Sequence, residues 1–168
     1  MTISMYNASV PVFKQLLSAL SAILVKAESA GNIEMQPETL LHARLFPDMF
    51  DFIRQVQIAT DFAKGVTARL AGLDVPVYED NETTFEELQA RVTKTLRFIS
   101  NIPAEKINGG EEREIIIRPG TPKEKKFNGD SYLLHYGLPQ FFFHITTAYA
   151  ILRSNGIDIG KRDYMGTF

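Results

Sequence analysis

The chain has 168 residues, of which 45% are hydrophobic and 23% are charged, a balance typical of a globular domain and unlike that of a disordered chain. Its formal net charge is -2, which disfavours nucleic-acid binding, because such proteins gain affinity from basic contacts to phosphates. Cysteine is absent, which excludes disulfides, thiolate nucleophiles and thiolate metal ligands. We expect a single domain over residues 1–168 with no nucleic-acid partner.

The N-terminal residues have no basic segment followed by an apolar one, so they do not resemble a signal peptide. Polar residues interrupt the apolar stretches well before the roughly 20 residues that a membrane span requires. We therefore expect a cytoplasmic protein with no membrane partner.

The first predicted element is a long amphipathic helix after Ser9, with apolar residues every three or four positions. Ser9 is its expected N-cap, and Gly31 with Asn32 is its expected stop signal. Its apolar stripe consists of Val10, Phe13, Leu16, Leu17, Leu20, Ile23, Leu24 and Ala27.

A short helix is expected to begin at Pro37 and to end before Pro47. A second long helix follows over residues 48–72, with Asp48 as its cap or first turn. Gly65 weakens its middle by about 1 kcal/mol relative to Ala, which suggests close helix packing there. The apolar stripe of this helix consists of Phe52, Val56, Ala59, Phe62, Val66 and Leu70.

An acidic loop leads to a third helix, which Thr84 and Glu87 open with a capping-box pattern and Pro103 ends. Its apolar stripe consists of Phe85, Leu88, Val92, Leu96 and Ile99. Charged residues on the second and third helices are expected to form solvent-exposed pairs three or four positions apart. These residues are Asp51, Arg54, Glu86, Glu87, Arg91 and Lys94.

Residues 112–128 predict a two-stranded hairpin. Three consecutive isoleucines within 113–118 favour a strand, Pro119-Gly120 is a turn dipeptide, and 123–127 can pair back. Because a lone hairpin is marginally stable in water, we expect it to pack on the helices or on a partner. It can cover a cleft, cap the bundle or build a dimer.

A fourth helix is expected over residues 130–156, with Asp130 as its cap and a kink near 134–135 because of Pro139. Its apolar stripe consists of Leu134, Leu138, Phe141, Ile145, Ala148 and Leu152. Of the three consecutive phenylalanines at 141–143, two are expected in the core and one on another surface. Core packing and a dimer interface are the alternatives for them.

Four long amphipathic segments and one hairpin predict an all-α fold, an antiparallel four-helix bundle with a small inserted β-hairpin. The connections after the first and third long helices are long. An up-down-down-up order with long crossovers therefore competes with a simple up-down-up-down order.

The three histidines are the first candidates for chemistry: His42, His135 and His144. His135 and His144 lie nine residues apart, on opposite sides of one helix, so they cannot share a metal on a regular helix. The sequence contains no HExxH, GxSxG or phosphate-binding glycine motif. Hydrogen-bonded core or boundary histidines are the simplest interpretation.

Two blocks carry a resemblance: residues 43–72 with the acidic loop after them, and residues 141–166. They resemble a domain-of-unknown-function family in the DinB/YfiT-like superfamily. The resemblance implies a four-helix bundle with long crossovers, frequent homodimers, and a divalent metal such as nickel or zinc held by three histidines. Characterised relatives include thiol-dependent S-transferases and isomerases.

The superfamily's metal pattern has one histidine on the second helix and HxxxH on the last long helix. On this sequence those positions correspond to Gln55, Gln140 and His144. Glutamine amides are weak ligands for nickel and zinc, so the resemblance implies a degenerate, metal-free site that binds a small molecule or satisfies its own hydrogen bonds. A metal held by His144, with His42 as a substitute ligand, is the alternative.

Two functions therefore remain. The first is a homodimeric small-molecule-binding or interaction protein with Gln55, Gln140 and His144 in its site and no cofactor. The second is an enzyme, either metal-dependent or with His144 as a general base, and by analogy a thiol-dependent transferase.

Overall fold

The computed structural model describes residues 3–30 and 36–168; the predicted stop signal at Gly31 and Asn32 lies outside them. Four long helices form the bundle in the described residues: α1 (Val10–Glu28), α3 (Phe52–Leu70), α4 (Phe85–Ser100) and α7 (Leu138–Ser154). The shorter elements are α2 (Pro37–Leu41), α5 (Ala104–Ile107), β1 (Ile115–Ile117), β2 (Lys125–Phe127), α6 (Gly129–Ser131), the π-helical segment η1 (Tyr132–Gly137) and α8 (Lys161–Met165).

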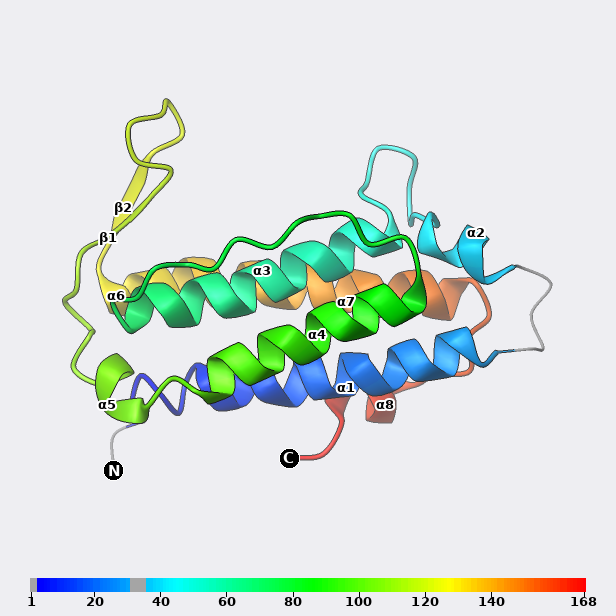
Figure 1. Ribbon diagram of the computed structural model, residues 1–168, viewed down its shortest axis with the longest axis horizontal. Coiled ribbons are helices and arrows are strands. Elements are labelled where there is room, and N and C mark those ends of the chain that lie inside the picture. Colours follow the sequence, from blue (N-terminus) through cyan, green and yellow to red (C-terminus); the bar gives the residue numbers. More distant parts are fainter. Residues whose placement is uncertain (1–2, 31–35) are drawn as a thin grey trace.

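The helices follow an up-down-down-up order: α1 and α7 run in one direction, and α3 and α4 in the other (Figure 1). α3 packs against both α7 and α4, and α1 packs against α4. Because α3 and α4 are parallel, the chain must cross the length of the bundle between them, and residues 71–84 do so (Figure 1). We call this segment the crossover. It follows the second long helix, not the first or third as the sequence analysis expected.

The apolar stripes predicted for the helices largely form the core. Every stripe residue of α1 is buried, and so is every one on α3 except Phe62, which is half-buried. On α4 only Leu96 is half-buried. α1 is the one described helix that is long and apolar enough for a membrane span. This finding corrects the expectation that no segment of the chain is long and apolar enough. Half of that apolar window is buried in the bundle.

The capping box of α4 is confirmed, since Glu87 N donates to Thr84 Oγ1 at 3.1 Å and Thr84 N donates to a Glu87 carboxylate oxygen at 3.2 Å.

The caps of the other helices differ from prediction. Asp51, not Asp48, caps α3 by accepting the hydrogen bond of a backbone N–H three residues on, at 3.0 Å. Ser9 is the N-cap residue of α1 as predicted, but its hydroxyl donates to the carbonyl of Met5 at 2.7 Å and makes no capping bond to the helix. Asp130 lies inside α6 with no capping bond.

The irregularity predicted from Pro139 takes the form of η1. A proline ring opposes the carbonyl four residues earlier, here that of His135, and a widened π turn accommodates the ring. The altered rotation leaves Leu134 half exposed, so its assignment to the apolar stripe was wrong. A Cβ on Gly137 would lie 2.7 Å from Val66 Cγ2, so glycine lets η1 approach α3 closely.

The three consecutive phenylalanines divide differently from expectation. Phe141 is fully buried, but Phe142 and Phe143 are 38% and 55% exposed, so only one ring is in the core. The helix carries the other two to its outer surface.

The hairpin is confirmed as an antiparallel pair in which Ile115 lies opposite Phe127. Ile115 and Ile117 are buried, and the Phe127 ring centroid lies 5.2 Å from that of Tyr136. The base of the hairpin therefore packs on the start of the last helix, while its turn projects beyond the bundle (Figure 1).

Candidate functional site

The bundle brings together two of the residues that the sequence nominated. His144 Nδ1, on α7, lies 2.8 Å from Gln55 Oε1, on α3, and both side chains are buried. Gln55 Nε2 donates to the carbonyl of Phe50 at 3.2 Å, which orients the amide so that its oxygen faces the imidazole. The amide oxygen can only accept, so the proton of His144 is assigned to Nδ1. We call this unit the His144–Gln55 pair.

The environment of the pair keeps the imidazole neutral. Burial, together with the smaller effect of the charge of Arg54, lowers the pKa of His144 to about 4. Since a general base works best when its pKa is near the working pH, His144 is a poor proton acceptor at neutral pH.

The remaining candidates lie apart from the pair. Gln140 is one turn earlier on α7 and lines a separate surface pocket, with no hydrogen bond to Gln55 or His144 recorded for the described residues. His42 is largely exposed, and its Nδ1 lies 3.4 Å from a carboxylate oxygen of Asp51. The trio expected from the resemblance is therefore a pair.

The donor set does not fit a nickel or zinc centre. Within residues 3–30 and 36–168, no group of three or more His, Asp or Glu side chains could hold a metal ion. The pair offers one imidazole nitrogen and an amide oxygen that already accepts a hydrogen bond. Zinc sites in proteins instead use three or four nitrogen, sulfur or carboxylate ligands.

Arg91 on α4 is the largest correction to the sequence analysis, which placed it on a solvent-exposed face. Its side chain is 2% exposed, and all five guanidinium N–H groups have acceptors. Nε donates to Thr60 Oγ1 at 2.7 Å, and Nη1 donates to Glu79 O at 3.1 Å and to Glu82 Oε1 at 2.9 Å. Nη2 donates to Asp61 Oδ1 at 2.8 Å and to Gln57 O at 3.4 Å, and it forms an ion pair with Asp80 Oδ1 at 3.1 Å. We call this unit the Arg91 network.

The Arg91 network fastens the crossover to the bundle. Two further contacts support it: Gln57 Nε2 donates to Glu82 at 2.8 Å, and Arg54 pairs with Asp80. The sequence did contain a signal, the acidic residues of the loop. Helix spacing could not match them to Arg91, because their partner lies on another element.

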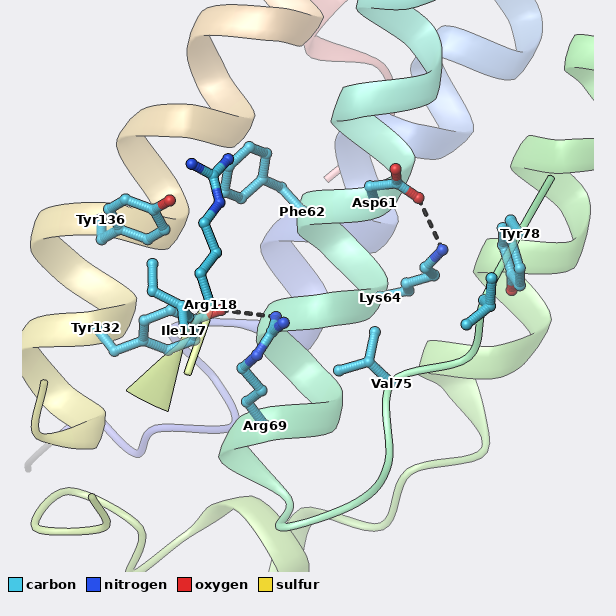
Figure 2. Close-up of a pocket in the computed structure, with 11 residues that line it drawn as sticks. Asp61, Phe62, Lys64, Arg69, Val75, Tyr78, Ile117, Arg118, Tyr132 and Tyr136 are labelled. Atoms are coloured by element: carbon cyan, nitrogen blue, oxygen red, sulfur yellow. Dashed lines mark hydrogen bonds and ion pairs between the residues drawn. The ribbon is translucent and has the colours of Figure 1, made fainter. Parts of the chain in front are cut away.

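The fastened crossover forms one wall of a pocket of about 340 Å³, which we call the crossover pocket (Figure 2). α3, the hairpin and η1 form the other walls. The lining residues are Asp61, Phe62, Lys64, Arg69, Val75, Val77, Tyr78, Ile117, Arg118, Tyr132 and Tyr136.

Aromatic rings line the side of the pocket next to α7. The rings of Tyr132 and Tyr136 stack at 5.8 Å and 23°, and Phe62 meets Tyr136 edge-on at 5.9 Å. The other side of this cluster reaches the buried pair, since the rings of Phe62 and His144 stack at 6.0 Å and 12°. The sequence analysis assigned Phe62 to the core and missed its place in a pocket wall.

Charged side chains line the rest of the pocket. Lys64 Nζ lies 2.7 Å from Asp61 and 3.7 Å from the ring centroid of Tyr78. Arg69 Nη1 donates to the Tyr132 hydroxyl at 3.1 Å. Burial raises the pKa of Tyr132, and the charge of Arg69 opposes that shift, so the phenol stays protonated at neutral pH.

The comparisons with known proteins agree with this architecture. The chain is similar over 97% of its length to 92% of a solved structure described as a DinB family member protein from Shewanella denitrificans, with 37% identity and a TM-score of 0.89. The protein is thus a DinB-like helical bundle. A family model described as a domain of unknown function, DUF1993, matches residues 5–165, and the chain belongs to that family. No curated protein matches it.

Proposed function

We propose that this protein is a metal-independent small-molecule-binding protein whose ligand occupies the crossover pocket. The observation that carries the proposal is the His144–Gln55 hydrogen bond of 2.8 Å. Gln55 and His144 stand at positions where the superfamily pattern would have two metal-binding histidines. Their hydrogen bond engages the glutamine oxygen that a metal would need as a ligand. What remains beside the pair is a pocket with an aromatic wall.

The composition of the crossover pocket supports a ligand-binding role. Its volume of about 340 Å³ falls in the usual range for small-molecule sites, and such sites combine apolar walls with a few polar groups. Val77, at its edge, is 91% exposed, and a bound ligand would cover part of that apolar surface.

The pKa of His144, lowered to about 4, favours this binding role over the alternative of an enzyme with a histidine general base. A metal-dependent enzyme of the thiol-transferase kind would need ligands besides His144. His42 is the alternative that the sequence offers, but its ring contacts Asp51.

We also propose that the protein forms a homodimer through the outer surface of α7. Phe142 and Phe143 are 38% and 55% exposed, and large exposed aromatic side chains are typical of interfaces. A Phe143→Ser variant that sediments as the wild type does would contradict this surface as the interface.

The test of metal independence is plasma mass spectrometry on untagged, natively purified protein, with and without added nickel, zinc and manganese. We expect well under one metal per chain under every condition. His144→Ala serves as a matched control, because the metal content of this variant should equal that of the wild type. About one metal per chain, lost in the variant, would contradict the proposal and restore the metal-dependent enzyme.

A further inference from the structure

The charge of the crossover pocket indicates what kind of ligand it binds. Lys64 and Arg91 both pair with Asp61, the one carboxylate among the lining residues. Two basic side chains remain, Arg69 and Arg118. Among the described residues, no ion pair involves either guanidinium. The pocket therefore carries an excess of positive charge beside its aromatic wall.

Arg69 occupies its place because of a neighbouring glycine. A Cβ on Gly65, one turn earlier on α3, would lie 2.8 Å from Arg69 Nη1 and 3.9 Å from Val75 of the crossover. The absence of that Cβ makes room for the guanidinium against the helix, where the Tyr132 hydroxyl accepts one of its hydrogen bonds. Gly65 thus accommodates a side chain, and not the close helix packing that the sequence suggested.

Arg118 reaches the pocket from the other side. It is the one non-glycine residue of the described chain with positive φ, at 53°, a left-handed conformation that costs energy for a residue with a Cβ. Its side chain extends from the end of β1 towards Phe62 and Tyr136 (Figure 2). Strain of this kind often accompanies a functional position.

We propose that the crossover pocket binds a small carboxylate that carries an aromatic ring. Guanidinium groups match a carboxylate with paired, charge-assisted hydrogen bonds, and the Tyr132 hydroxyl has a proton to donate. The ring of the ligand packs against Phe62 and Tyr136, with Val75 and Ile117 on the other walls. This inference rests on the proposed binding function and adds the class of ligand.

The test uses three probes of similar shape and different charge: benzoate, neutral benzamide and cationic benzylamine. Each is titrated into the full-length protein by calorimetry and by NMR. We expect saturable binding of benzoate, with benzamide at least about tenfold weaker, because hydrogen bonds to charged groups contribute that much. Benzylamine should not bind, and benzoate affinity should fall as salt rises.

Two variants locate the contact. Arg118→Gly keeps the left-handed backbone that glycine adopts freely and should weaken benzoate at least about fivefold while leaving benzamide unchanged. Lys123→Ala, an exposed cation in the turn of the same hairpin, is the matched control and should bind as the wild type does.

The outcomes separate the two proposals. If benzamide or benzylamine binds as well as benzoate, or if Arg118→Gly leaves benzoate affinity unchanged, the carboxylate inference is wrong and the binding function stands. If no probe binds up to its solubility limit, the inference is also overturned. One metal per chain in a sample that still binds benzoate would contradict only the metal-independent part of the proposed function.

Discussion

The His144–Gln55 pair and the Arg91 network are both polar units that involve α3, but they are built in opposite ways. The pair is neutral, and one hydrogen bond between two helices joins it. The network is charged, and it joins α3, α4 and the crossover through one arginine and three carboxylates. A neutral pair can be buried cheaply, whereas a buried guanidinium is tolerated only if every N–H has an acceptor. The loop that supplies those acceptors thereby becomes the wall of a pocket.

The largest expected change in the free energy of unfolding comes from a variant of the Arg91 network. Replacement of Arg91 by Met leaves three carboxylates without their shared partner and should lower the free energy of unfolding by about 3–5 kcal/mol. Urea denaturation at pH 7 measures it. Arg97→Met, an exposed arginine on the same helix, is the control and should change stability by no more than about 0.5 kcal/mol. A similar small loss in both variants would show that the network does not hold the crossover.

The second prediction concerns the His144–Gln55 pair and the pH dependence of the free energy of unfolding. The folded pKa of His144, about 4, lies below the unfolded value of about 6.5, so the unfolded chain binds the extra proton between those values. The contribution of His144 to stability is complete above pH 6.5 and is lost as the pH falls towards 4, by about 1–3 kcal/mol.

His144→Gln should remove this part of the pH dependence, because glutamine does not titrate. The measurement is the free energy of unfolding of wild type and variant between pH 7 and pH 4. His135→Gln, at an exposed histidine of η1, is the control and should follow the wild-type curve. Parallel curves for all three proteins would contradict the lowered pKa.

The smallest effect tests the place that Gly65 makes for Arg69. Gly65→Ala gains helix propensity of up to about 1 kcal/mol but pushes the Arg69 guanidinium aside. We expect a net change in unfolding free energy of less than about 1 kcal/mol, together with weaker benzoate binding. Urea denaturation and benzoate titration measure the two effects. Unchanged benzoate affinity would separate Arg69 from the binding site.

Much of the helical architecture was predictable, because apolar periodicity reports which face of a helix is buried without reference to its partner. The stripe of α1 and the capping box of α4 depend on residues three or four positions apart, and both predictions are confirmed. Ser9 holds the predicted N-cap position of α1 without a capping bond, and the caps expected at Asp48 and Asp130 were wrong. Several nearby residues can be of a type that caps helices, and the sequence does not show which of them will lie at the N-cap position. In α3 that residue is Asp51.

Less of the candidate site could be predicted from the sequence. Registration against the family pattern located Gln55 and His144, which the fold joins across 89 positions of sequence. It did not find Arg91, Arg69 or Arg118. Charges at helical spacing are ordinarily exposed pairs, and nothing local distinguishes an arginine whose partners lie in a loop.

By itself, the sequence determined the helices, the hairpin, the family resemblance and the presence of glutamines at two of the three positions where metal-binding histidines were expected. Only the tertiary structure decided that the crossover follows α3, that Arg91 is buried, and that two arginines border an aromatic wall. The physical reason is the separation along the sequence over which each interaction acts. Periodicity and capping act within one or two turns, whereas desolvation and charge compensation depend on which segments the folded chain brings together.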